Sequence, residues 1–219
     1  MSYGYIMLIV VSTIIGAAAQ FYVNSQLNKH KEVACSFGLT GEQAAKRMLA
    51  AHNVGGVPIH RGSEGQDHFD PRSNSITLDP HAFGKTSITA VATACHEVGH
   101  ACQYAQGYGP MKFRSALVPV VNFSSNAWMI VLIMGIALNI VGLIDLAIVL
   151  FAFAVLFQLV TLPVEFNASH RAMDYLKASG LPQGEQAAAF SVLRACALTY
   201  VAAALVSILQ LLWLLGQRD

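Results

Sequence analysis

The chain has 219 residues, of which 55% are hydrophobic and only 11% are charged, and its formal net charge at pH 7 is +1. A soluble domain usually carries about 25% charged residues, so this composition argues against an ordinary soluble protein. It also argues against a nucleic-acid partner, because no run of Lys and Arg exceeds two residues and no phosphate-binding patch is indicated.

Four long segments contain no charged residue, and a helix needs roughly 20 apolar residues to cross a bilayer. The first and the last segment fit one span each, and the middle pair fits two spans joined by a tight turn at 142–145. We therefore expect four transmembrane helices with the lipid bilayer as a partner. The alternative is a buried helical hairpin of a soluble protein over 117–164. The uncharged segments are 3–23, 115–144, 146–164 and 195–217.

Residues 1–23 are expected to form an N-terminal transmembrane anchor. Ala17-Ala18-Ala19 resembles the cleavage site of a signal peptide. However, no Lys or Arg precedes the apolar run, whereas a signal peptide normally begins with a positively charged segment. We therefore expect this segment to be retained.

Lys and Arg gather in two segments, 24–114 with nine of them and 161–194 with three. Such residues mark the cytoplasmic side of short loops. With four spans, both segments fall on the same side of the membrane. We expect a multi-pass protein of the cell (inner) membrane whose active site faces the cytoplasm.

Between the spans, residues 24–116 are long enough for a small cytosolic domain, and 165–194 makes a second, shorter cytosolic segment. The predicted fold class is therefore a mainly α membrane protein with about four transmembrane helices and a cytosolic α+β domain that contains a small sheet. The remaining segments are the anchor at 1–23, a two-helix transmembrane hairpin at 117–164 and a C-terminal transmembrane helix at 195–219.

Two helices are expected in the cytosolic domain. Thr40-Gly41-Glu42-Gln43 has the pattern of a capping box, in which the Thr and Gln side chains satisfy free backbone N–H groups. A helix should run from there to about His52. The segment from Ser87 to about Gln106 is rich in Ala and contains no Pro, and it predicts the second helix.

Short strands are predicted by VPIHR at 57–61 and SITL at 75–78, which are flanked by turn residues. An Asp-Pro pair between them predicts a turn. Asp67, His68 and Asp70 could form a second metal site, but an exposed turn is the interpretation that we favour.

The segment VATACHEVGHACQY, residues 91–104, lies in the second predicted helix. Residues four apart on a helix point the same way, so His96 and His100 can offer two imidazole nitrogens to one ion. Zn²⁺ accepts imidazole ligands in a tetrahedron. Glu97 can hydrogen-bond a metal-bound water and take its proton as the water attacks a peptide carbonyl. This is the H-E-x-x-H pattern of metalloproteases.

A catalytic zinc also needs a third protein ligand and an open fourth position. Glu165, in LPVEFNASHRAMDYL, is the best candidate because it follows the third span, and the topology returns it to the side of His96. An acid so close to an apolar run is costly unless it is paired or ligated. Pro163 is expected to kink the helix and aim the carboxylate inward. The alternative for Glu165 is a solvated carboxylate at a helix end.

Three further side chains are candidates for supporting roles. His170 could be a ligand, but it lies five residues from Glu165 on a different helix face. We therefore expect it to contact a ligand or to donate to the transition state. Asp174 could orient a ligating His through its free N–H. Tyr104 could donate to an oxyanion, although packing is the interpretation that we favour.

The motifs DHFDP, SITL, HEVGHACQY and LPVEFNASHRA occur in this order, and together they resemble the YugP-like neutral zinc metallopeptidases of bacterial membranes. The resemblance covers essentially the whole chain, spans included. It implies a membrane-embedded, gluzincin-like peptidase with a zincin-like domain at 24–116. By carry-over, His96, His100 and Glu165 would hold Zn²⁺ and Glu97 would be the general base.

The zincin resemblance also implies where the substrate lies. In zincin folds, an edge strand before the metal helix pairs with the peptide through main-chain hydrogen bonds. The strand that holds Ile76 and Leu78 precedes the predicted metal helix, and we expect the peptide to bind there.

A broader resemblance is to the HtpX-type membrane metallopeptidases, whose third-ligand motif is usually E-x-x-A-D. In this chain Ser169 stands where Asp is expected. This difference removes the usual orienting carboxylate, and Asp174 or Asn167 could substitute for it.

The expected function is zinc-dependent hydrolysis of a protein or peptide substrate. The alternative is a non-catalytic zinc-binding membrane scaffold or adaptor, but a structural site has no use for a base such as Glu97 beside its ligand. A metal transporter is disfavoured, because it needs acidic or His residues within its spans and the predicted spans hold only Asp145, near a turn.

Overall fold

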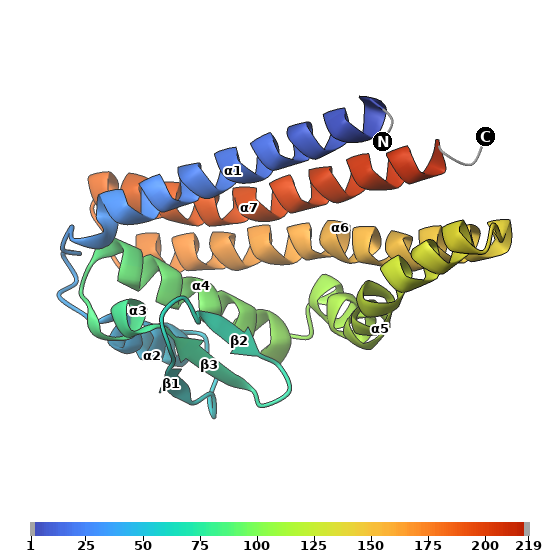
Figure 1. Cartoon of the computed structure of the whole chain (residues 1–219). Helices are drawn as coiled ribbons and strands as arrows, with labels where there is room; N and C mark the ends of the chain where they lie inside the picture. Colours follow the sequence, from blue (N-terminus) through green and yellow to red (C-terminus); the bar gives the residue numbers. More distant parts are fainter. Residues whose placement is uncertain (1–2, 217–219) are drawn as a thin grey trace.

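The computed structural model describes residues 3–216, and its main part is helical (Figure 1). Three short strands form a small sheet between the second and third helices. The predicted class, a mainly α membrane protein with a small sheet, is confirmed. In chain order the elements are α1 Tyr3–Lys31, α2 Gly41–Ala51, β1 Ile59–Arg61, β2 His68–Asp70, β3 Ser75–Leu78, α3 Pro80–Gly84, α4 Ile88–Ala105, α5 Gly109–Ala137, α6 Val141–Ala178 and α7 Gln183–Leu215.

Within the described residues, α1, α5, α6 and α7 are each long and apolar enough to cross a membrane, with mean hydropathy between 1.7 and 2.6 over their most apolar windows. Figure 1 shows that the start of α1, the connection between α5 and α6 and the end of α7 lie at one end of the molecule. The sheet and the helices α2, α3 and α4 lie at the other end. The molecule therefore has a helical stem and a lobe that carries the polar segments.

The connection between α5 and α6 differs from its predicted position. The sequence predicts a turn at 142–145, but α5 ends at Ala137 and α6 begins at Val141. Asn139 between them has a φ of 55°, a left-handed conformation that Asn adopts more readily than most residues. Asp145, taken as part of the turn, lies inside α6.

A single helix joins two segments that the sequence analysis separates at 164 and 165. Helix α6 has 38 residues and is about 57 Å long at a rise of 1.5 Å per residue. The hydrocarbon core of a bilayer is only about 30 Å thick, so one end of α6 must project from it. Pro163 lies inside the helix, which continues through it to Ala178. Glu165 therefore lies on the same continuous helix as the third span.

The sheet has the order β1-β3-β2, with β1 parallel and β2 antiparallel to β3. The turn that follows β2 at residues 71–74 agrees with the prediction. The exposed turn expected at 67–70 is wrong, because His68–Asp70 is a strand with Phe69 buried. Three residues are too short to show the two-residue alternation that identifies a strand.

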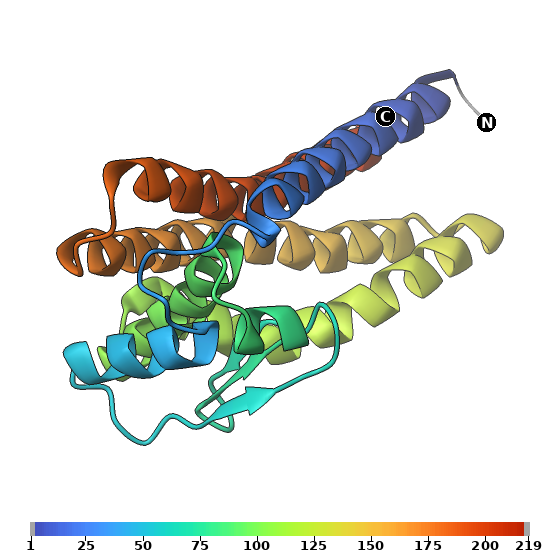
Figure 2. The same cartoon turned by 90° about the vertical axis from the view of Figure 1, so that its left-hand side faces the viewer.

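Helix α4 is the centre of the lobe, and 14 of its 18 residues are buried. Ser87 caps its first turn by accepting a hydrogen bond from the backbone N–H of Ala90. Figures 1 and 2 show α2 and the sheet on one side of α4, with α6 and α7 on the other. The predicted capping box of α2 is present, with Thr40 and Gln43 bonded to each other in both directions. Side chains of α4 can therefore meet both the sheet and the helical stem.

Candidate metal centre

The close approach of α4 and α6 depends on Gly99. A Cβ atom at this position would lie 2.6 Å from the backbone oxygen of Ala168 and 3.0 Å from its Cα. No larger residue fits without moving one of the two helices. The absence of a side chain at Gly99 therefore lets the backbone of α6 pack directly behind the histidines of α4.

Three side chains meet at this contact. The Nε2 atoms of His96 and His100 are 3.2 Å apart. The Oε2 atom of Glu165 lies 3.3 Å from His96 Nε2 and 3.5 Å from His100 Nε2. The side chains are only 13%, 8% and 3% exposed in the order His96, His100, Glu165. The structure thus brings together the three residues that the sequence selects as ligands, and Glu165 is not a solvated helix end.

The spacing of these three atoms fits a zinc ion. Donors bound about 2.0–2.1 Å from a tetrahedral Zn²⁺ lie about 3.3–3.4 Å from one another. The three distances between His96, His100 and Glu165 are 3.2, 3.3 and 3.5 Å. Two imidazoles and a carboxylate are also a donor set that zinc prefers. The described residues contain no other group of three such side chains close enough to hold a metal ion.

The far nitrogen of each histidine has a partner of its own. His100 Nδ1 lies 3.1 Å from Gln103 Oε1, and His96 Nδ1 lies 3.1 Å from Ser169 Oγ. Partners of this kind fix the orientation of a ligating imidazole and leave Nε2 free for the metal. Neither Gln103 nor Ser169 was predicted for this role. A signal existed, because Gln103 follows His100 by three residues and Ser169 follows Glu165 by four, which places each pair on one helix face.

His170 and Asp174 do not support the ligands. They contact each other at 3.2 Å on the surface, with side chains 72% and 56% exposed. The expectation that Asp174 orients a ligating histidine is therefore wrong, because the shorter Ser169 already occupies that position. Asn167 contributes indirectly, since its Oδ1 accepts a hydrogen bond from Gln103.

Glu97 is buried beside the histidine pair, with 6% of its surface exposed. The negative charge of Glu97 acts on His100. Burial disfavours protonation of His100, but the hydrogen bond to Glu165 and the negative charges of Glu97 and Glu165 outweigh this effect and hold the pKa of His100 above its ordinary value. The raised pKa reflects the negative potential that these two carboxylates create at His100.

The predicted substrate strand is wrong in its position. Strand β3, with Ile76 and Leu78, is the central strand of the sheet and both side chains are fully buried. Both of its sides are paired, so it has no free backbone groups for a peptide. The strand β2 is an edge, and it packs against α4. Tyr104 of α4 is half-exposed, and its ring lies 5.7 Å from that of Phe69 on β2, which fits the packing role.

A cavity of about 140 Å³, lined mostly by polar residues, lies between α1, α3 and the first turns of α4. Thr93 in its wall is one helical turn before Glu97. Asp67 also lines it and accepts a hydrogen bond of 2.8 Å from the backbone N–H of Asp79. Burial, together with the charges of Asp79 and Glu97, raises the pKa of Asp67 to about 7. The sequence could not reveal this cavity, because its walls come from segments far apart in the chain.

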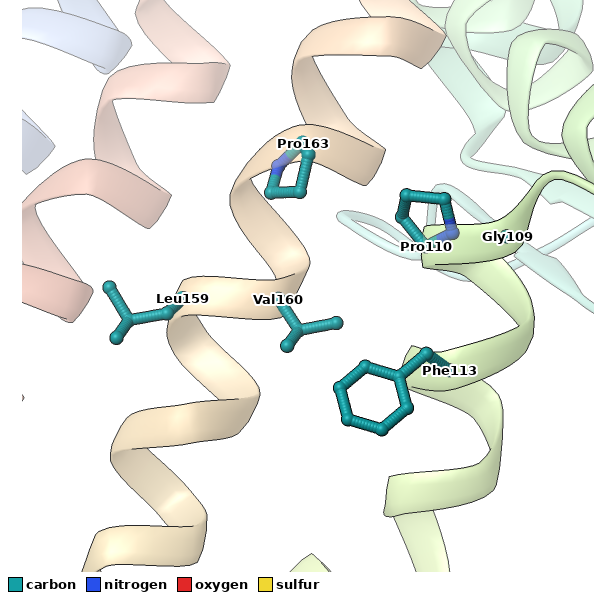
Figure 3. Close-up of a pocket in the computed structure, with 6 residues that line it drawn as sticks. All are labelled: Gly109, Pro110, Phe113, Leu159, Val160 and Pro163. Atoms are coloured by element: carbon teal, nitrogen blue, oxygen red, sulfur yellow. The ribbon is translucent and has the colours of Figure 1, made fainter.

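A second cavity, of about 430 Å³, lies between α5 and α6 and is almost entirely apolar. Figure 3 shows Pro110 and Phe113 of α5 facing Val160 and Pro163 of α6 across it. Pro163 is two residues before Glu165, which is about 200° around the helix. This cavity therefore belongs to the opposite face of α6 from the ligand cluster.

Comparisons with known proteins agree with this geometry. A family profile described as "Putative neutral zinc metallopeptidase" matches residues 5–218. The chain is 43% identical over 197 residues to "Putative membrane protease YugP" of Bacillus subtilis (strain 168), an alignment that covers 89% of this chain and 87% of that protein. No solved structure gives a significant match. The similarity extends through the helical stem as well as the lobe.

Proposed function

From the premise that this chain belongs to the family described as "Putative neutral zinc metallopeptidase", we propose that it is a membrane-bound, zinc-dependent endopeptidase. The observation that carries the proposal is the convergence of three donor atoms at tetrahedral spacing beside a buried carboxylate, Glu97. His96, His100 and Glu165 hold the ion. Three protein ligands leave one tetrahedral position open, as catalytic zinc sites require.

Each residue has a definite chemical role. When bound, zinc lowers the pKa of water and polarises the scissile carbonyl. Glu97 takes the proton of the attacking water and delivers it to the leaving amine. The almost complete burial of His100 and Glu165 keeps competing water away from the ligands and strengthens the electrostatic interactions among these groups.

The peptide is proposed to pair with the free edge of β2, His68–Asp70. This strand is bonded to β3 on one side only, and it packs more extensively than β1 against the metal helix α4. Addition of an extended peptide to such an edge supplies main-chain hydrogen bonds that do not depend on the peptide's sequence. Substrates would then be proteins or peptides with an accessible extended segment.

The lobe is proposed to lie in the cytoplasm. The nine Lys and Arg residues of 24–114 lie in the last turn of α1, in the lobe or in the first residues of α5. The connection at the opposite end of the stem carries none. A membrane-impermeant maleimide applied to intact cells tests this orientation. Cysteine introduced by Leu138→Cys should be labelled, and cysteine introduced by Glu64→Cys should be labelled only after permeabilisation. The reverse pattern would invert the topology.

The catalytic proposal is tested by comparing the purified wild type with Glu97→Gln. The variant should retain zinc and lose roughly 10²–10⁴-fold in cleavage rate, the usual contribution of a general base. Zinc content is measured by metal analysis, and cleavage by casein digestion or self-cleavage. Glu64→Gln, in an exposed loop, is the matched control and should leave both quantities unchanged.

Two outcomes of this comparison reject the catalytic mechanism. Equal cleavage by the wild type and Glu97→Gln would remove Glu97 from the reaction. A zinc-loaded wild type that cleaves no substrate would instead identify the site as the centre of a non-catalytic scaffold.

A further inference from the structure

Gln103 is the most completely buried polar side chain near the metal centre, with none of its surface exposed. Its amide makes three hydrogen bonds. Oε1 lies 3.1 Å from His100 Nδ1, and Nε2 donates to the backbone oxygen of Val164 at 2.8 Å and to Asn167 Oδ1 at 3.0 Å. The NH₂ group of the amide thus joins α4 to α6 through both of its hydrogens, while its oxygen contacts His100 within α4.

The orientation of this amide is determined by its partners. A backbone oxygen can only accept a hydrogen bond, so the atom of Gln103 that faces Val164 must be the NH₂ group. The oxygen of Gln103 therefore faces His100, which must donate from Nδ1. A neutral imidazole protonated at Nδ1 has its lone pair on Nε2, the atom that faces Glu165.

A second contact supports the same orientation. Arg171 donates from Nε to Asn167 Oδ1 at 2.8 Å and from a terminal nitrogen to Gln106 Oε1 at 2.7 Å. Arg171 has no acceptor, so the oxygen of Asn167 must point toward it. That oxygen is then also available to receive the second N–H of Gln103.

In the sequence, the two α6 residues that bond Gln103 lie on either side of the ligand Glu165. Val164 immediately precedes Glu165, and Asn167 follows it by two residues. The Gln103 amide therefore contacts the ligand His100 directly and hydrogen-bonds the helical turn that carries the ligand Glu165. The contact of His96 is different, because the Ser169 hydroxyl can rotate and can either donate or accept. Only the Gln103 contact specifies the tautomer of its histidine.

We propose that Gln103 is a positioning residue of the metal centre, which sets the tautomer of His100 and holds the Glu165 turn against it, while Asn167 and Arg171 fix the orientation of the amide. The inference rests on the proposed zinc site. Loss of a partner of this kind typically weakens metal binding by about 10–100-fold.

Zinc affinity, measured by competition with a chromogenic chelator on the full-length protein in detergent, tests the proposal. Gln103→Met has nearly the same length but no hydrogen-bonding amide, and it should weaken zinc binding by about 10–100-fold. Gln106→Met is the matched control at the end of the same helix, and it should retain the wild-type affinity because Arg171 still holds Asn167 through Nε. The Tm of each zinc-free protein is measured in parallel.

The variant Gln103→Glu separates positioning from simple hydrogen-bond acceptance. A carboxylate can accept from His100, but it cannot donate to Val164 or Asn167 and would face two oxygens. We expect weaker zinc binding than in the wild type, and restored or tighter binding would overturn the bridging role. Asn167→Ala, which removes only one partner of the amide, should weaken zinc binding less than Gln103→Met and serves if the latter does not fold.

The outcomes distinguish this inference from the proposed function. If the wild type binds zinc and both Gln103→Met and Asn167→Ala bind it equally well, the positioning role is rejected and the zinc site stands. A lowered Tm of the zinc-free protein with an unchanged zinc affinity would also reject it, since Gln103 would then be a packing residue. If the wild type itself binds no zinc, the proposed function fails.

Discussion

Gly99 of α4 lies directly against the backbone of Ala168 on α6, so that a Cβ on the glycine would be 2.6 Å from the alanine oxygen. Each of the two residues lies close in sequence to a candidate metal ligand. Gly99 precedes His100 by one residue, and Ala168 follows Glu165 by three. The separation of the two helices at this point therefore controls the distance from Glu165 to both histidines.

Gly99→Ala should destabilise the protein and weaken its zinc binding together. The added methyl group meets backbone atoms that cannot rotate away, and overpacking of this kind typically costs about 1–3 kcal/mol. The helices must separate to relieve the contact, which moves Glu165 away from His96. Thermal unfolding and zinc titration measure the two effects. Gly84→Ala is the control, because nothing lies within 4 Å of a Cβ there, and an effect of equal size in this variant would contradict the explanation.

Glu165→Gln should reduce zinc affinity by more than the loss of a residue that only hydrogen-bonds a ligand, which typically weakens binding by about 10–100-fold. The substitution keeps the size of the side chain but replaces the only anionic donor of the cluster with a weak neutral ligand. Metal analysis after dialysis against a chelator measures the change, with Glu97→Gln as the comparison that should keep its zinc. Unchanged zinc content in Glu165→Gln would show that another residue completes the ligand set.

Zinc affinity should fall as the pH is lowered, and the fall should begin above the ordinary pKa of histidine. A ligating imidazole must be neutral. Burial lowers the pKa of His100, but the hydrogen bond to Glu165 and the negative charges of Glu97 and Glu165 outweigh it and hold this pKa above its usual value. Protons therefore compete with zinc at a higher pH than for free histidine, whose pKa is about 6.5. Chelator competition at a series of pH values measures this dependence. A zinc affinity that stays unchanged from about pH 8 down to about pH 6 would contradict this prediction.

Zinc should also raise the Tm of the protein. A ligand that binds only the folded state contributes about 2.7 kcal/mol when its concentration is 100 times its Kd. Thermal unfolding with zinc and with excess chelator measures this difference, which should be largely absent from Glu165→Gln. An equal rise in that variant would indicate that zinc acts somewhere other than at this cluster.

Asp67→Asn should remove part of the pH dependence of stability. Burial raises the pKa of Asp67 to about 7 in the folded protein, above the value of the unfolded chain. The folded state then binds more protons between these two pKa values, so stability is lost as the pH rises through about 7. Asn resembles the protonated acid and does not titrate. The difference in Tm between about pH 5 and about pH 8 should be smaller in Asp67→Asn than in the wild type. The exposed-loop variant Glu64→Gln should keep the full difference.

Features with a local signature were predictable from the sequence. The capping box at Thr40 identified the start of α2, and the length of four uncharged apolar segments identified the helices of the stem. The spacing of His96 and His100 places both on one face of α4. The position of the connection at Asn139 was missed, because the charge pattern does not mark where an apolar helix ends.

The order of the strands in the sheet and the contacts between α4 and α6 were not predictable with the same rules. SITL at 75–78 reads as a strand from its residues, but nothing in it says whether the strand is central or at an edge. That property depends on whether β2 forms on its second side. Similarly, Ser169 stands where the HtpX-type motif has Asp, and we expected this difference to remove an orienting group. The Ser169 hydroxyl nevertheless reaches His96, because the helices approach so closely.

By itself the sequence determined which segments form long apolar helices and which helix presents two imidazoles and a carboxylate, because neighbouring residues settle these properties within a few turns. Only the tertiary structure decided that Glu165 and Ser169 meet those imidazoles, that Gln103 bonds the turn of Glu165 and that β3 is enclosed by two other strands. The contacts of Glu165, Gln103 and Ser169 join residues of α4 and α6 that are more than 60 positions apart. Their distances depend on how closely the two helical backbones pack at Gly99.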